Sequence, residues 1–82
     1  MSASKVYLVY WCNNERWEDY EECVDAVFST RERAEQYIID KGYTPHVCES
    51  EWEKKHMADR FDQRFDKYTV HSMWVREMEV DK

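Results

Sequence analysis

The sequence predicts a small α+β domain, in which a mostly antiparallel three-stranded sheet carries one or two helices on one face. Three apolar stretches alternate with the period of two that is typical of strands, and two charged stretches between the last two of them repeat with a helical period. The chain has 82 residues, which is the length of a single domain, 1–82. The expected order is strand, strand, helix, helix, strand.

The first strand is predicted at Lys5–Cys12, with the sequence KVYLVYWC. Both of its sides are apolar, so we expect a strand that is covered on both faces. A buried helix is the competing interpretation, but the run is short and is followed by Asn13-Asn14, which favours a strand. One side of this strand would present Val6, Leu8, Tyr10 and Cys12, and the other Tyr7, Val9 and Trp11.

A second strand is predicted at Cys23–Phe28, after the polar, turn-like residues Asn13–Asp19. The two strands would form an antiparallel hairpin whose loop is too long for a tight two-residue turn. Strict alternation would place Val24, Ala26 and Phe28 on one side and Cys23, Asp25 and Val27 on the other.

A helix is predicted at about Thr30–Lys41. Ser29 is the expected N-cap, and Glu32 three residues later would complete a capping box. Gly42, the only glycine, stands where a left-handed residue would end the helix. Ala34, Tyr37 and Ile38 would form its apolar face.

A short extended piece is expected at His46–Cys48, followed by a second helix at about Glu51–Phe65. Ser50 and Glu53 would form its capping box. Its apolar stripe would be formed by Ala58, Phe61, Phe65 and Tyr68.

The third strand is predicted at Tyr68–Val80, a run long enough to be bulged or bent. One face would carry Tyr68, Val70, Trp74, Met78 and Val80, and the other His71, Met73, Val75, Glu77 and Glu79.

Composition excludes several classes of function. The net charge of −6 and the pI near 5.0 argue against nonspecific binding to nucleic acid or to an anionic membrane. No segment approaches the roughly 20 apolar residues of a membrane span, and the N-terminal MSASK is not followed by a signal-peptide core. We therefore expect a cytoplasmic protein, with reduced thiols at Cys12, Cys23 and Cys48 that are buried as small apolar groups.

Acidic residues are concentrated in one stretch, Glu15–Asp25, with the sequence ERWEDYEECVD. It holds six acids and one arginine, a net charge of −5, so the rest of the chain is nearly neutral. Trp17 and Tyr20 stand among the acids, and both residue types are common anchors at interfaces. The residues expected to contact a partner are Glu15, Trp17, Glu18, Asp19, Tyr20, Glu21, Glu22 and Asp25.

Two interpretations of this stretch stay open. It is either a docking surface for a basic protein or a solvated loop that only aids solubility. If the partner itself binds nucleic acid, the carboxylates would stand in for phosphates, as in a DNA mimic. The alternative function is a structural module that self-associates, as in a homodimer, through exposed rings and a sheet edge, with Trp52 and Trp74 as candidate exposed anchors.

The sequence contains no motif typical of an enzyme, and we expect neither catalysis nor a cofactor. It has no glycine-rich phosphate loop, no GxSxG and no HExxH. Cys48 near a histidine in sequence does not establish a nucleophile with a positioned base. The acids lack the DxDxDG spacing of a calcium loop, and only His46-x-Cys48 among the histidines and cysteines has the close spacing of a zinc ligand pair.

The segments VYLVY at Val6–Tyr10 and VFSTRERAEQYI at Val27–Ile38 resemble a group of small uncharacterised α+β domains of phages and bacteria. The resemblance covers roughly the first 40 residues and the C-terminal strand, whereas Tyr43–Lys67 departs from the pattern. It implies a fold and no reaction. A chain of this size and acidity also resembles phage host-takeover proteins, which implies an inhibitor that covers one host protein.

Overall fold

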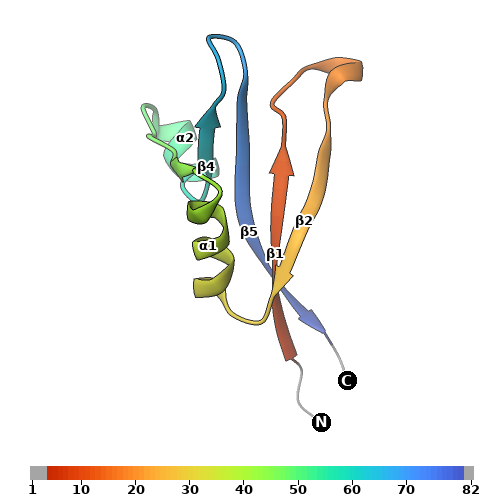
Figure 1. Ribbon diagram of the computed structural model, residues 1–82. Coiled ribbons are helices and arrows are strands. Elements are labelled where there is room, and N and C mark those ends of the chain that lie inside the picture. Colours follow the sequence, from red (N-terminus) through yellow and green to blue (C-terminus); the bar gives the residue numbers. More distant parts are fainter. Residues whose placement is uncertain (1–3, 81–82) are drawn as a thin grey trace.

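The computed structural model describes residues 4–80 and shows an α+β fold (Figure 1). Residues 1–3, part of the stretch considered for a leader sequence, and residues 81–82 lie outside the described part. The strands form one antiparallel sheet in the order β2-β1-β5-β4-β3. In chain order the elements are β1 (Ser4–Cys12), a 3₁₀ turn (Trp17–Asp19), β2 (Glu22–Phe28), α1 (Arg31–Asp40), β3 (Thr44–Pro45), α2 (Glu51–His56), β4 (Phe61–Arg64) and β5 (Val70–Val80).

The centre of the sheet is the pairing of β1 with β5. The two strands run antiparallel without a register shift, from Ser4 opposite Val80 to Cys12 opposite Ser72. The predicted hairpin of the first two strands is confirmed, because β1 also pairs antiparallel with β2. The alternation predicted for the last strand is confirmed within β5, where Met73 and Val75 are buried beneath α1.

The core lies on one face of the sheet. Val9, Met73 and Val75 from the strands pack with buried side chains of α1 and with Tyr43. Figure 1 shows no helix on the opposite face of the sheet in the described part of the chain. The prediction that β1 is covered on both sides is therefore wrong, because a single long helix can shield only one face of a sheet.

Helix α1 and its N-cap each lie one residue later than predicted. Thr30 is the N-cap, since its hydroxyl accepts a hydrogen bond of 3.2 Å from the Arg33 amide, so the predicted cap at Ser29 is wrong. Gly42 has φ +92° and ends the helix as predicted. The Gly42 and Tyr43 amides donate to the carbonyls of the last helical turn, which brings Tyr43 into the core.

Helix α2 is much shorter than predicted. Its cap at Ser50 is confirmed, but the helix ends at His56, and Phe61–Arg64 is strand β4. Phe61 lies opposite Met73 in β5 and packs against the core, so pairing with the open edge of β5 replaces further helical turns. This strand and β3 raise the number of strands from the predicted three to five.

The extended piece before α2 also lies elsewhere than predicted. It is β3 at Thr44–Pro45, not His46–Cys48, and it pairs with β4. Among the described residues all three cysteines are free, but only Cys12 is buried, while Cys23 is exposed and Cys48 is partly buried. The expectation of three buried thiols is wrong for Cys23. None of the helices in residues 4–80 has the length and apolarity needed to cross a membrane.

Candidate functional site

The loop between β1 and β2, residues 13–21, forms a hairpin tip that extends beyond α1 (Figure 1, orange). The Asn13 side chain holds this acidic hairpin tip together. Its Oδ1 accepts hydrogen bonds from the amides of Glu15 at 3.0 Å and Glu21 at 3.1 Å, and its Nδ2 donates to the Asp19 carbonyl at 2.7 Å. The loop therefore has a fixed conformation, which the asparagine imposes by tying its two sides to one side chain.

Asn14 connects the acidic hairpin tip to the sheet. Its Nδ2 donates to the Val70 carbonyl and to the Ser72 hydroxyl, both at 2.8 Å. Its backbone is left-handed, with φ 57°, a conformation that asparagine tolerates better than most residues. The tip is thus anchored on β5 as well as on its own hairpin.

Trp17 is almost fully exposed in the tip. Its side chain is 91% exposed, and its backbone has φ 60°. A bulky residue in the left-handed region costs about 1–2 kcal/mol, and an indole in water gains nothing from burial. Folding alone gives no reason for tryptophan here, and strained, exposed residues of this kind are typical of functional surfaces.

The loop that carries Trp17 also carries one basic residue, Arg16, and four carboxylates without an ion-pair partner in the described chain. Within residues 4–80, Glu15, Glu18, Asp19 and Glu21 form no ion pair. The structure therefore brings these four predicted residues together with Trp17 on the acidic hairpin tip.

Tyr20 and Glu22 lie at the base of the tip and contact each other. The Tyr20 hydroxyl donates a hydrogen bond of 2.7 Å to Glu22, and this bond, with partial burial, raises the pKa of Tyr20 to about 12. The tyrosine therefore stays neutral over the physiological range, and half of its ring remains exposed.

Asp25 is separated from the other predicted residues by a β-bulge. Val24 pairs with Tyr10 and Ala26 with Val9, so Asp25 is the extra residue and the strict alternation predicted for this strand is wrong. Its carboxylate accepts a hydrogen bond of 2.6 Å from the Tyr37 hydroxyl and lies 3.2 Å from the Lys41 ammonium of the segment after α1. These contacts lower the pKa of Asp25, and its charge serves the scaffold.

A polar network at the N-terminal end of β5, where the acidic hairpin tip is anchored, supports the tip. His46 lies between two carboxylates, with Nδ1 bonded to Asp62 and Nε2 3.0 Å from Glu53 of α2. The buried Ser72 hydroxyl donates to Asp62 at 2.6 Å and accepts from Asn14, which links the network to the tip. Hydrogen bonds to the two carboxylates raise the pKa of His46, because a charged imidazole can donate from both nitrogens.

This network was not predicted from the sequence. The sequence indicates His46 only as one member of a close-spaced pair with Cys48, whereas its partners in the structure lie 7 and 16 residues away. The two carboxylates meet different ring nitrogens, so they do not converge on one point. In the described part of the chain, no group of three or more potential ligands has the arrangement of a metal site.

The two tryptophans considered as exposed anchors differ. Trp52 on α2 is 63% exposed and lies against the His56 ring. Trp74 is only 8% exposed, so its prediction as an exposed anchor is wrong. Tyr10 stacks beside it and the Arg60 guanidinium lies over its face, and these side chains cover it where no helix does.

Comparison of the chain with protein-family models, with curated proteins and with solved structures finds no match in any of the three.

Proposed function

We propose that this protein is a non-enzymatic binding module whose acidic hairpin tip docks on a basic protein. The observation that carries the proposal is Trp17, an exposed indole on a strained backbone in the midst of unpaired carboxylates. Such a ring buries a large apolar area on contact, and the surrounding charges select a basic surface and speed the encounter.

Preorganisation supports the same function. Because Asn13 and Asn14 hold the tip by five side-chain hydrogen bonds, little conformational entropy remains to be lost when a partner binds. Seven of the eight predicted contact residues lie on the tip or at its base. Asp25 is excluded from the binding surface because Lys41 neutralises it.

The most specific form of the proposal is a phage-type inhibitor that covers the nucleic-acid-binding face of a host protein. Carboxylates on the tip would then occupy the positions of phosphates, and binding would weaken with salt. The net charge of −6 fits a protein that competes with nucleic acid instead of binding it.

The test is affinity capture from bacterial lysate, with mass spectrometry to identify what is retained. A Glu18→Lys/Asp19→Lys variant should bind the partner at least tenfold more weakly, as expected for two reversed charges. The matched control is Glu49→Lys/Glu79→Lys, which makes the same change in net charge at exposed acids away from the tip. Trp17→Ala should also lose the partner, because it removes the apolar anchor.

The outcomes separate the two levels of the proposal. Equal capture by the tip variant and the control variant contradicts docking through the acidic hairpin tip. If a captured partner is released by added duplex DNA, the nucleic-acid-mimicking form is supported. A partner that duplex DNA does not displace leaves docking in place and excludes that form.

The alternative, self-association, has one supporting observation. Strand β2 is a sheet edge, and beside it the uncovered face exposes Val24 and Val27. If two copies pair along this edge, light scattering at high protein concentration should give the mass of a dimer, and Val27→Lys should give the mass of a monomer. A monomeric mass for the wild-type protein at every concentration excludes this alternative.

A further inference from the structure

The uncovered face of the sheet carries a row of cations and rings. Tyr10 and Trp74, directly opposite each other on β1 and β5, stack with ring centroids 5.7 Å apart and planes 10° apart. The Arg60 guanidinium lies 4.7 Å from the Trp74 ring centroid, and the Arg76 guanidinium lies 4.9 Å from that of Tyr10. The rings fix the planes of both guanidinium groups, because stacking on an aromatic face restricts the otherwise mobile side chain.

These two arginines keep their hydrogen-bonding capacity. Within the described chain neither guanidinium forms an ion pair, and neither donates a hydrogen bond to the protein. Each has five N–H donors in a planar fork, the geometry that matches a phosphate or carboxylate bidentately. In a chain with 18 acids and 12 basic residues, two arginines on one face without a carboxylate partner leave a local surplus of donors.

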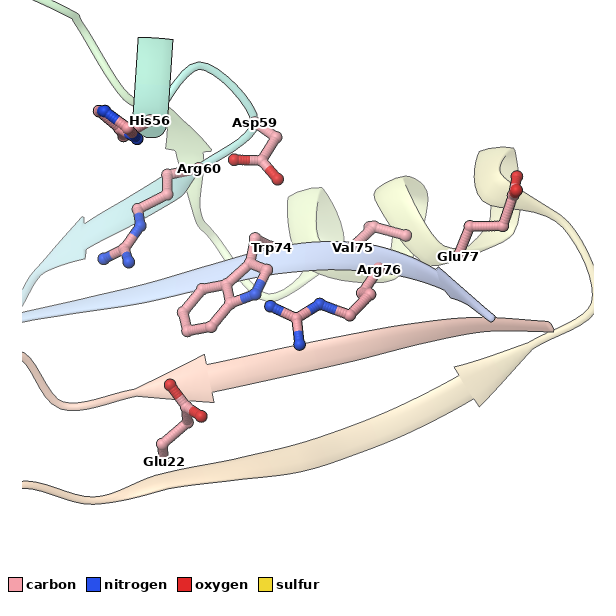
Figure 2. A pocket seen from close by; sticks show the side chains of 8 residues that line it. All are labelled: Glu22, His56, Asp59, Arg60, Trp74, Val75, Arg76 and Glu77. Carbon is pink, nitrogen blue, oxygen red and sulfur yellow. The ribbon is translucent and has the colours of Figure 1, made fainter. Parts of the chain in front are cut away.

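Both arginines line the same cavity, of about 450 Å³. Figure 2 shows their side chains on either side of the Trp74 indole, with Glu22 across the sheet from them. Glu22 and Asp59 also line the cavity, so it has acceptors beside its two cations, whereas Glu77 belongs to the other face of β5 and is paired with Lys5. A long polyanion would be repelled by this acidic rim, whereas a small ligand with one anionic group and several hydroxyl or amino donors complements it.

We propose that this cavity is a binding site for a small organic phosphate ester. The phosphate of the ligand would accept hydrogen bonds from one guanidinium, and acceptor atoms of its organic part would accept hydrogen bonds from the other. Its hydroxyl or amino groups would donate hydrogen bonds to Glu22 or Asp59. This site shares Glu22 with the base of the acidic hairpin tip, but it needs no protein partner, so ester binding can be measured separately from docking.

The test is isothermal titration of the full chain with guanosine 5′-monophosphate, ribose 5-phosphate and guanosine. Saturable binding of the phosphate esters below about 1 mM, with guanosine at least tenfold weaker, supports the site. Tighter binding of the nucleotide than of ribose 5-phosphate identifies the base as the second group, and equal binding identifies a sugar phosphate. No saturable binding of either ester, or equal binding of guanosine, overturns the proposal.

Variants locate the binding. Arg60→Gln and Arg76→Gln should each weaken ester binding about tenfold, the loss expected for a charge-assisted hydrogen bond, while Arg33→Gln on the exposed side of α1 should leave it unchanged. Arg76 is exposed, so Arg76→Gln retains the fold even where loss of Arg60 loosens the packing of Trp74. Ester binding that both cavity variants retain at the wild-type affinity overturns the assignment.

Discussion

Gly42 and Trp17 both have a positive φ, but only one of them has a structural reason for it. Gly42 with φ +92° ends α1 at no steric cost, and a side chain there would also lie 2.9 Å from the Gln63 amide nitrogen. Trp17 adopts a similar backbone with a large side chain and receives no burial in return. Gly42 is required by the backbone and can be recognised from the sequence. The unfavourable backbone of Trp17 has no structural reason, and a binding role would explain it.

At Trp17, glycine and alanine should differ in stability. Both substitutions remove the indole, but only glycine removes the steric strain of the left-handed backbone. The free energy of unfolding of Trp17→Gly should therefore be about 0.5–1 kcal/mol higher than that of Trp17→Ala. Urea denaturation of the two variants measures this difference. If the two are equally stable, the backbone at this position is not strained, and the proposal rests on exposure and charge alone.

At the scale of elements, the short helix α2 depends on one histidine. Six residues make too short a helix to be stable alone, and Glu53 reaches from it to His46. Ser50 caps the same helix and Asp62 holds the other side of the imidazole. The position of α2 is therefore set by hydrogen bonds that need a protonated histidine.

Stability should consequently fall as pH rises. The folded pKa of His46 lies above its ordinary value of 6.5, so its contribution is complete below pH 6.5 and is lost as pH rises through the folded pKa. The pKa of Glu53 is lowered from 4.5, so its share is present above pH 4.5 and is lost as pH falls through the lowered pKa. The network should be strongest between these limits.

The measurement is the unfolding free energy of wild type and His46→Gln over this pH range. The stability difference between them should be largest near pH 5–6 and shrink on the alkaline side. Glu49→Gln, on the same loop, serves as the control and should follow the wild-type profile. A difference that is independent of pH would show that His46 is not held as an imidazolium.

At the scale of the whole molecule, the sheet has one buried and one uncovered face. Two methionines of β5 report on the two faces. Met73 is 1% exposed beneath α1, whereas Met78 is 45% exposed on the uncovered face. Met73→Ala should cost about 2–5 kcal/mol, and Met78→Ala about 0.5 kcal/mol. Similar losses in denaturant unfolding would mean that the second face is buried in solution, as the self-association alternative requires.

The acidic hairpin tip shows how far the candidate site could be predicted. The charge density around Trp17 is a property of composition and can be counted directly from the sequence. The bulge that turns Asp25 toward Lys41 could not be, because it depends on how β2 pairs with β1. The placement of Arg60 over Trp74 and of Arg76 over Tyr10 was likewise hidden, because each arginine meets a ring from another segment of the chain.

The sequence by itself determined the elements whose signals are local: the hairpin of β1 and β2, helix α1 with its terminal Gly42, and the alternation of β5. Only the tertiary structure decided the conformation of Phe61–Arg64, which lies within the helically spaced stripe Ala58, Phe61, Phe65 and Tyr68 but forms β4. The physical reason is that a helix satisfies its hydrogen bonds within the segment, whereas a strand does so with a partner that sequence periodicity does not reveal. The open edge of β5 supplied that partner and set Asp62 opposite Ser72, where Asp62 meets His46 and Ser72 meets Asn14 of the acidic hairpin tip.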